Sequence, residues 1–174
     1  TREEFDGSAW ARIARSHLGG LPPEVDLKAE VALGNVVRAL SAADGPDGRP
    51  LVRAAHDLSN GGLLQSLVDS ALRFGIGGVF DVAGAARRDC VGDHEMLLSE
   101  SQARAFVAVP EVAVKAVFAA AEAEGVDAIR IGTTGGDMLA ISGVDLLAAE
   151  GEGCGWIASI DELRELSDTG RTYF

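Results

Sequence analysis

The sequence is short of aromatic residues, cysteines and long apolar runs. Phe, Trp and Tyr make up 5% of the 174 residues, so we expect a core of Ala, Val, Leu and Ile. The two cysteines, Cys90 and Cys154, lie far apart without the spacing of a metal site, which favours reduced thiols over a disulfide framework. No apolar stretch reaches the roughly 18 residues that a membrane-spanning helix needs, so we expect no membrane segment.

Basic residues are also scarce relative to acidic ones. Lys and Arg number 15 against 27 Asp and Glu, which gives a formal net charge of −12. A protein that binds the phosphate backbone of nucleic acid needs a basic surface, so we expect no nucleic-acid partner. The remaining composition, 47% hydrophobic and 24% charged, is that of an ordinary globular protein with enough length for one core.

The first 26 residues lack helical periodicity, and Pro22-Pro23 resists helix formation. We therefore predict an extended lead-in arm over residues 1–26 and a single α+β domain over residues 27–174. The polar start, Thr1 to Glu4, is unlike a secretory signal, so a cytoplasmic location is expected. The chain starts with Thr instead of Met, which favours a piece of a longer polypeptide.

The hydrophobic pattern of the rest predicts an α+β fold with a mixed or antiparallel sheet layered with helices. Apolar residues recur at helical spacing over 27–43, 63–75, 112–124 and 160–166, and Asp26 is a candidate N-cap. A polar loop is expected after Val82. The predicted strands are 51–55, 79–82, 105–109, 128–131 and 138–141, with a hairpin connection at 132–137.

The segment from Ala55 to Leu63, AHDLSNGGL, joins a predicted strand to a predicted helix through two glycines. Glycine lets a ligand approach the backbone, and the amides at a helix start favour an anion such as phosphate. Asp57 is the candidate ligand for a divalent metal beside that phosphate. A simpler interpretation, which the residues alone favour, is that Ser59 or Asn60 caps the helix and Gly61-Gly62 makes the turn. The candidate phosphate- or nucleotide-binding residues are Ser59, Asn60, Gly61 and Gly62.

A second polar segment, Glu100-Ser101-Gln102, offers a carboxylate, a hydroxyl and an amide in succession before a predicted strand. Such a set can hydrogen-bond a ribose or an amide-bearing ligand. The alternative is that Glu100 or Ser101 ends a short helix and faces water. His56 is the best acid–base candidate, but it has no Ser or Cys nucleophile at a recognisable spacing, so no catalytic residue is assigned.

Taken in order, several segments resemble the C-terminal domain of the aminoimidazole ribonucleotide synthetase-like superfamily. They are AHDLSNGGL with the helix after it, Gly75-Ile76-Gly77-Gly78 and Leu98-Ser99-Glu100-Ser101. Within it, the chain most resembles the large-subunit family of phosphoribosylformylglycinamidine synthases, through residues 18–27, 131–133 and 160–164. Selenophosphate synthetase and thiamine-monophosphate kinase, which belong to the same superfamily, stay as alternatives.

The resemblance implies a domain of an ATP-dependent ligase that converts formylglycinamide ribonucleotide to formylglycinamidine ribonucleotide with glutamine-derived ammonia. It implies Mg²⁺ and ATP or ADP as cofactors. The implied partners are the other domains of the same polypeptide, a glutaminase subunit and a small accessory subunit. Because such a chain lacks the nucleotide-handling half, the isolated domain is expected to be inactive.

The resemblance also implies residue roles. Asp57 matches a magnesium-associated aspartate, and Glu100, Ser101 and Gln102 match a substrate-contacting triplet of the catalytic first half of the tandem family. The Pro pair of the arm, in contrast, resembles the second half. Asn60 stands where the family usually has another aspartate, which favours a supporting domain over a catalytic one. The remaining alternative is a structural domain whose nucleotide site has decayed.

Overall fold

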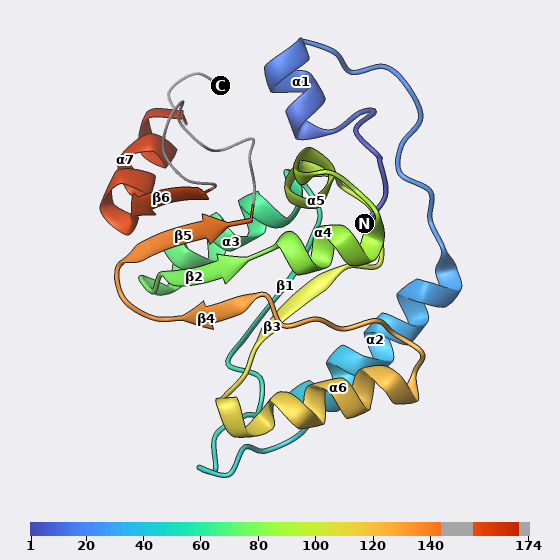
Figure 1. Ribbon diagram of the computed structural model, residues 1–174, viewed down its shortest axis with the longest axis vertical. Helices are drawn as coiled ribbons and strands as arrows, with labels where there is room; N and C mark the ends of the chain where they lie inside the picture. Colours follow the sequence, from blue (N-terminus) through green and yellow to red (C-terminus); the bar gives the residue numbers. More distant parts are fainter. Residues whose placement is uncertain (144–154, 171–174) are drawn as a thin grey trace. The chain divides into compact units, whose positions relative to one another are not determined.

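The structure, a computed structural model, describes residues 1–143 and 155–170. Helices and short strands are mixed along the chain (Figure 1), which confirms the α+β class. Cys90 is exposed and is not part of a disulfide, whereas Cys154 lies outside the described residues. Across 1–143 and 155–170, no helix combines the length and the apolar character that crossing a membrane requires.

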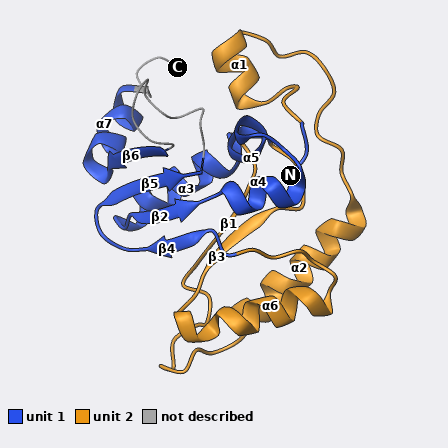
Figure 2. Ribbon diagram, viewed as in Figure 1, with its two compact units in different colours: residues 1–3, 61–99, 130–174 blue, residues 4–60, 100–129 orange. Residues whose placement is uncertain are grey.

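The contacts divide the chain into two compact units, each built from separate stretches of sequence (Figure 2). The first, which we call the sheet unit, comprises residues 1–3, 61–99 and 130–174. The second, the arm unit, comprises residues 4–60 and 100–129. The chain therefore passes from one unit to the other several times, and the domain boundary at 26/27 stays a prediction.

The sheet unit contains a four-stranded mixed sheet in the order β4-β2-β5-β6. β2 pairs antiparallel with β4 and parallel with β5, and β5 pairs antiparallel with β6. The strands are β2 (Gly78–Asp81), β4 (Gly132–Thr134), β5 (Met138–Ser142) and β6 (Gly155–Ser159).

The predicted strand at 128–131 and the predicted hairpin at 132–137 are wrong. β4 begins at Gly132, and its partner is β2, which lies between β4 and β5. Two observations explain the difference. A Cβ on Gly132 would collide with the Val79 carbonyl oxygen, so only glycine allows this close pairing. The connection after β4 is also tied to Gly77, whose N–H donates to the Gly136 carbonyl and whose carbonyl accepts from Gly135.

Alternation along the strands places one face of the sheet in the core. Phe80 and Ile141 are buried cross-strand partners, whereas Val79 and Ile157, 62% and 63% exposed, lie on the other face. Helices supply the rest of this core. α3 (Gly62–Phe74) contacts α5 (Asp93–Leu98) and α7 (Ile160–Gly170), and Leu97 of α5 is completely buried.

The polar loop expected after Val82 is also wrong, because α4 (Ala83–Asp89) and α5 fill this region. Three alanines and two arginines, all good helix formers, give α4 its helix propensity, and it ends at Cys90 with a left-handed φ of 56°. α5 carries Asp93 and Glu95 in its first turn, where negative charge is favourable.

The arm unit is built on a two-stranded antiparallel ladder, in which Ala54 pairs with Ala108 and Asp57 with Ala105. α2 packs against α6 over a small core that contains Val36 and Leu40. Its elements are α1 (Ala9–Arg15), α2 (Leu27–Ser41), β1 (Ala54–Asp57), β3 (Ala105–Ala108), the 3₁₀-helix η1 (Glu111–Ala113) and α6 (Val114–Ala123).

The lead-in arm is extended only in part. Residues 16–26 form no helix or strand, but α1 lies inside the segment that was predicted to be extended. Its first turn is capped by Ser8, whose Oγ accepts a hydrogen bond from Ala11 N. Asp26 is the N-cap of α2, as predicted, and its Oδ1 accepts from Lys28 N and Ala29 N.

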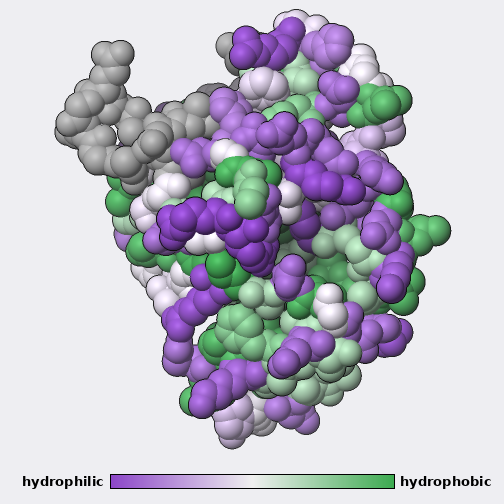
Figure 3. Space-filling model, turned by 45° about the vertical axis from the view of Figure 1, so that its right-hand side comes forward, coloured by the Kyte–Doolittle hydropathy of each residue, from purple (hydrophilic) through white to green (hydrophobic). Residues whose placement is uncertain are grey.

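The arm unit also has apolar side chains on its surface. Figure 3 shows hydrophobic areas broken up by hydrophilic ones, with several in the lower half, at the height of α2 and α6 in Figure 1. The exposed large apolar residues of the arm and the start of α2 are Ile13, Leu18, Leu21, Val25, Leu27 and Val31.

Candidate functional site

Asp57 lies at the last position of β1. The strand pairing is extended by one residue, because Leu58 N donates to the Arg104 carbonyl oxygen at 2.9 Å and the Leu58 side chain is buried. Asp57 itself is displayed at the surface, with a side chain 76% exposed. His56 Nδ1 lies 3.6 Å from Asp57 Oδ1, and the imidazole stacks on Phe106 of β3. The ladder therefore fixes the backbone of Asp57 while its carboxylate remains accessible from solvent.

After Asp57, the chain turns into α3 through Gly61 and Gly62. Both glycines have positive φ, 73° and 65°, and Gly61 is the N-cap without a side-chain hydrogen bond. Ser59 and Asn60 are exposed and neither is the N-cap, so the simpler interpretation is correct about the turn and wrong about the capping residue. The N-cap residue of α3 thus supplies no side-chain acceptor to the first turn, a condition that suits an anion.

The requirement for glycine at position 62 comes from the chain itself. A Cβ there would lie 2.7 Å from the carbonyl oxygens of Leu97 and Ser99. At Gly61, by contrast, a Cβ would meet the side chain of Gln65. The backbone at the end of α5 approaches Gly62 closely in the position where sequence reasoning expected a ligand.

The second predicted segment is held by hydrogen bonds. Glu100 Oε1 accepts from Ala9 N at 2.8 Å, at the start of α1, and Glu100 N donates to the Glu4 carbonyl. Ser101 is 2% exposed, so it does not face water as the alternative supposed. Gln102 Nε2 donates to the Glu100 carbonyl at 3.3 Å. In the alternative interpretation Glu100 or Ser101 ends a short helix, whereas the helix here, α5, ends just before them, at Leu98.

Both predicted segments meet at one end of the ladder within the arm unit. β1 ends at Asp57 and the antiparallel β3 begins at Ala105, so residues 58–60 and 100–104 lie at the same end. The bond from Leu58 N to the Arg104 carbonyl joins them directly. The structure therefore brings together Asp57 and the segment that carries Gln102, while Gly61 and Gly62 belong to the sheet unit.

The described residues contain no group of three or more His, Cys, Asp and Glu side chains that can hold a metal ion. Mg²⁺, however, is commonly bound through one or two carboxylates, waters and the phosphates of a substrate. An accessible Asp57 fits that mode as a single carboxylate beside a phosphate. Asn60 has an amide side chain, so it adds no negative charge beside Asp57.

Two contacts beside the predicted segments were missed by sequence reasoning. Ala103, which follows Gln102, has a left-handed φ of 56°, and its N–H donates to Glu30 Oε1 on α2 at 2.8 Å. Ser99 is completely buried and its Oγ donates to the Arg2 carbonyl at 2.7 Å. Neither pair has a sequence signal, because the partners lie far apart in the chain.

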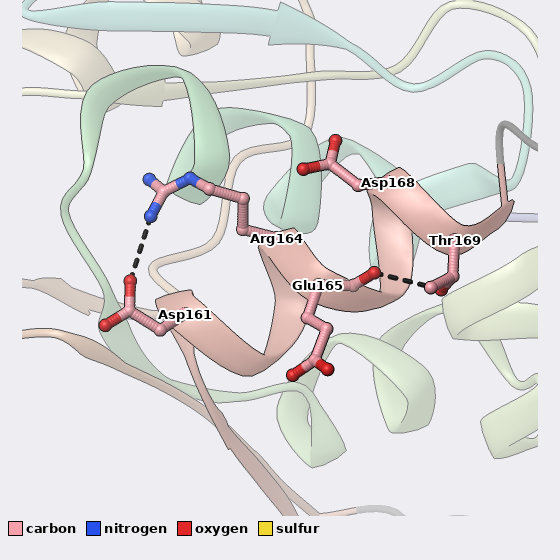
Figure 4. A pocket seen from close by; sticks show the side chains of 5 residues that line it. All are labelled: Asp161, Arg164, Glu165, Asp168 and Thr169. Atoms are coloured by element: carbon pink, nitrogen blue, oxygen red, sulfur yellow. Dashed lines mark hydrogen bonds and ion pairs between the residues drawn. The ribbon is translucent and has the colours of Figure 1, made fainter.

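A surface depression elsewhere shares no residue with these segments. It is lined by side chains of one helix, α7, namely Asp161, Arg164, Glu165, Asp168 and Thr169 (Figure 4). Arg164 Nη1 donates to Asp161 Oδ1 at 2.9 Å, so the one basic group is already paired. Three carboxylates and a neutralised arginine do not suit a phosphate, and we assign this depression no role in binding.

Glu162 and Asp47 are two carboxylates whose pKa values are lowered by structural hydrogen bonds. At the start of α7, hydrogen bonds from the backbone and the side chain of Ser159 lower the pKa of Glu162. Glu162 N in turn donates to Ser159 Oγ, which completes a capping box that the sequence Ser-x-x-Glu signals. In the turn before β1, a side-chain hydrogen bond from Arg53 lowers the pKa of Asp47. Neither group lies in the predicted site.

Comparison with known proteins identifies the family. Residues 3–142 match the family model described as AIR synthase related protein, C-terminal domain. The chain belongs to this family. The AIR synthase related C-terminal domain here is 44% identical over 143 residues to phosphoribosylformylglycinamidine synthase subunit PurL of a Nocardioides species, covering 82% of this chain and 17% of that protein. It is 42% identical over 165 residues to the same subunit of Renibacterium salmoninarum, and the match covers 95% of this chain and 19% of that protein.

Solved structures share the fold of this domain. "Structure of PurLQS from Thermotoga maritima" matches with a TM-score of 0.64 and 16% identity, over 92% of this chain and 24% of that one. "T. maritima PurL complexed with ATP" matches with a TM-score of 0.52 and 17% identity, over 65% of this chain and 19% of that one. The chain spans less than a fifth of the length of the Nocardioides and Renibacterium PurL subunits.

Proposed function

We propose that this chain is the C-terminal domain of a phosphoribosylformylglycinamidine synthase subunit. In that role it takes part in the ATP-dependent conversion of formylglycinamide ribonucleotide to its amidine with glutamine-derived ammonia. The observation that carries the proposal is 42–46% identity, over 77–95% of this chain, to subunits with that name. Because the chain spans less than a fifth of those relatives, the reaction requires the rest of the polypeptide, and the domain alone has no turnover.

The proposal gives the two polar segments different tasks. Asp57 offers one carboxylate oxygen to Mg²⁺, and the ion, when bound, offsets the negative charge of the nucleotide phosphates. Ser59, Asn60 and the glycine turn lie next to the phosphates. Glu100, Ser101 and Gln102 lie next to the substrate. Support comes from the exposure of Asp57 and from the ladder end that joins residues 58 and 104.

The proposed partners are the remaining domains of the same polypeptide, a glutaminase subunit and a small accessory subunit. One structure of similar fold is named PurLQS, which is in line with an assembly of several subunits. The proposal keeps the cytoplasmic location that we expect from the sequence.

A second candidate function is a structural domain that supports its neighbours without binding nucleotide. Two predicted ligand contacts are used inside the chain, which favours this candidate. Gly62 faces the backbone at Leu97 and Ser99, and Glu100 Oε1 accepts from Ala9 N.

The test uses the full-length polypeptide that carries this chain, assembled with its partner subunits. Amidine formation from formylglycinamide ribonucleotide, ATP and glutamine is measured for the wild type, for Asp57→Asn and for Asp127→Asn. Asp127 is an exposed aspartate of the same unit, so its variant removes the same charge away from the site. For a binding domain, we expect Asp57→Asn to raise the Mg²⁺ concentration needed for half-maximal activity about tenfold.

The outcomes separate the two candidates. Equal behaviour of the two variants, with wild-type activity intact, favours the structural domain. A wild-type assembly that forms no amidine rejects the synthase proposal itself.

A further inference from the structure

The backbone at Ala103 is unusual for its residue type. Its φ of 56° lies in the left-handed region, which is unfavourable for a residue with a Cβ. Such a conformation persists only where the surroundings enforce it, and it is more common at functional sites than elsewhere. Ala103 directly follows Glu100, Ser101 and Gln102, the residues proposed to lie next to the substrate.

Glu30 is the group that holds this conformation from outside the segment. Its Oε1 accepts a hydrogen bond from Ala103 N at 2.8 Å, in a partly buried position. The carboxylate is well anchored, because α2 is capped by Asp26 and packs against α6 over the core of Val36 and Leu40. A charged acceptor makes a stronger bond to an amide than a neutral one does, so this contact can offset the backbone strain.

The neighbouring contacts determine what the strain achieves. On one side, Glu100 is tied to Ala9 N, and Gln102 Nε2 is tied to the Glu100 carbonyl. On the other side, the Arg104 carbonyl accepts from Leu58 N at the end of the ladder. The left-handed residue lies between these two fixed points. The bond from Glu30 therefore fixes the backbone between Glu100 and Arg104 in one arrangement.

We propose that Glu30 is a positioning residue for the substrate-binding segment. Through Ala103 it holds Gln102 in the geometry that receives the substrate, so that binding does not have to order the segment first. The inference rests on the proposed function for the identity of the ligand, whereas the anchoring of residues 100–104 by Glu30 does not depend on it.

The test compares four variants in the full-length polypeptide with its partner subunits. They are Glu30→Ala, Glu30→Gln, Ala103→Gly and the double variant of Glu30→Ala with Ala103→Gly. Glu122→Ala removes an exposed glutamate of α6 and is the matched control. Two measurements are made: KM and kcat for formylglycinamide ribonucleotide, and hydrogen exchange of the amides of residues 100–104.

For Glu30→Ala we expect KM for formylglycinamide ribonucleotide to rise about tenfold, the size of one lost charge-assisted hydrogen bond, with a smaller change in kcat. Exchange over residues 100–104 should become faster. The side chain of Gln is as long as that of Glu and also carries an oxygen acceptor, so the KM of Glu30→Gln should stay within about threefold of wild type. The double variant should recover part of the lost affinity, because glycine adopts the left-handed conformation without the Cβ penalty.

Several results would overturn the proposal. The first is a double variant no better than Glu30→Ala, because the loss would then come from elsewhere in α2. The second is an unchanged KM in Glu30→Ala despite faster exchange. If the assembly forms no amidine at all, the synthase proposal fails, and exchange still decides whether Glu30 anchors the segment. If Glu30→Ala does not fold, Ala103→Pro, which removes the N–H that donates to Glu30, takes its place, and an unchanged KM in that variant would overturn the proposal.

Discussion

The turn from β1 into α3 and the segment from α5 to β3 reach the same end of one ladder but are held in opposite ways. In the first, left-handed glycines shape the backbone, and the polar side chains of Asp57, Ser59 and Asn60 are exposed. In the second, no glycine is present. Ser99 and Ser101 are buried, and hydrogen bonds to distant residues shape the backbone.

Because of this difference, substitutions in the first segment should affect ligand binding, and substitutions in the second should affect the stability of the fold. Where polar side chains are exposed and the backbone is fixed by glycine, a side-chain substitution can change ligand binding while leaving the fold intact. Where polar side chains are buried and bonded internally, their removal affects the fold first. The two segments therefore predict different responses to similar substitutions.

The largest expected effect is at Gly62. Gly62→Ala places a Cβ 2.7 Å from two backbone oxygens at a positive φ, so we expect a loss of about 3 kcal/mol or more in the free energy of unfolding. Gly75→Ala is the control, because it has a similar φ of 63° with no atom near its Cβ, and it should cost about 1 kcal/mol. Urea denaturation measures both. Equal losses would show that the close approach of Leu97 and Ser99 contributes nothing.

Two serines test the same contrast for side chains. Ser99→Ala removes a buried hydroxyl that donates to the Arg2 carbonyl, and it should lower the free energy of unfolding by about 1–2 kcal/mol. Ser59→Ala, at an exposed position, should change it by less than about 0.5 kcal/mol. Thermal unfolding of both variants measures the difference. A larger loss for Ser59 than for Ser99 would reverse the comparison.

Glu100→Gln has a smaller expected effect. The amide oxygen of Gln can still accept from Ala9 N, but the negative charge at the start of α1 is lost. We expect about 0.5 kcal/mol less stability, measured by hydrogen exchange in α1, and a loss that shrinks at high salt. A loss independent of salt would argue against the charge as its cause.

Asp57→Asn should change stability least, by less than about 0.5 kcal/mol, because its side chain is largely exposed. The same variant should weaken Mg²⁺-dependent binding of ADP to the full-length polypeptide about tenfold, since the metal loses its carboxylate ligand. Isothermal titration calorimetry with and without Mg²⁺ measures this effect, with Asp127→Asn as control. A marked loss of stability without a change in binding would make Asp57 a structural residue.

Local patterns predicted the four longest described helices, α2, α3, α6 and α7, well and the strand partners poorly. α2 was found because Asp26 caps it and its apolar residues recur at helical spacing, and both signals lie within a few residues. β4 was misplaced because its partner is β2 instead of the strand that follows it, and no local pattern specifies such a pairing. The short α4 lacked an apolar stripe and was taken for a loop.

The candidate site shows the same limit. The sequence indicated Asp57 and the glycine turn, because a strand, a polar turn and a helix follow one another. It did not indicate that Gly62 faces the carbonyl oxygens of Leu97 and Ser99, or that Glu30 bonds Ala103. These contacts depend on the tertiary arrangement. A residue type alone does not show whether a polar group binds a ligand or another part of the chain.

The order of the strands has a consequence for synthesis on the ribosome. β2 is complete at Asp81, but its neighbours β4 and β5 end at Thr134 and Ser142. A polypeptide emerges N-terminus first, so both edges of β2 lack their partner strands while the intervening stretch is made, and Phe80 lacks its cross-strand neighbour Ile141. Nascent chains that end before β5 should therefore be protease-sensitive and bound by chaperones, and protection should appear only after the C-terminal strands have emerged.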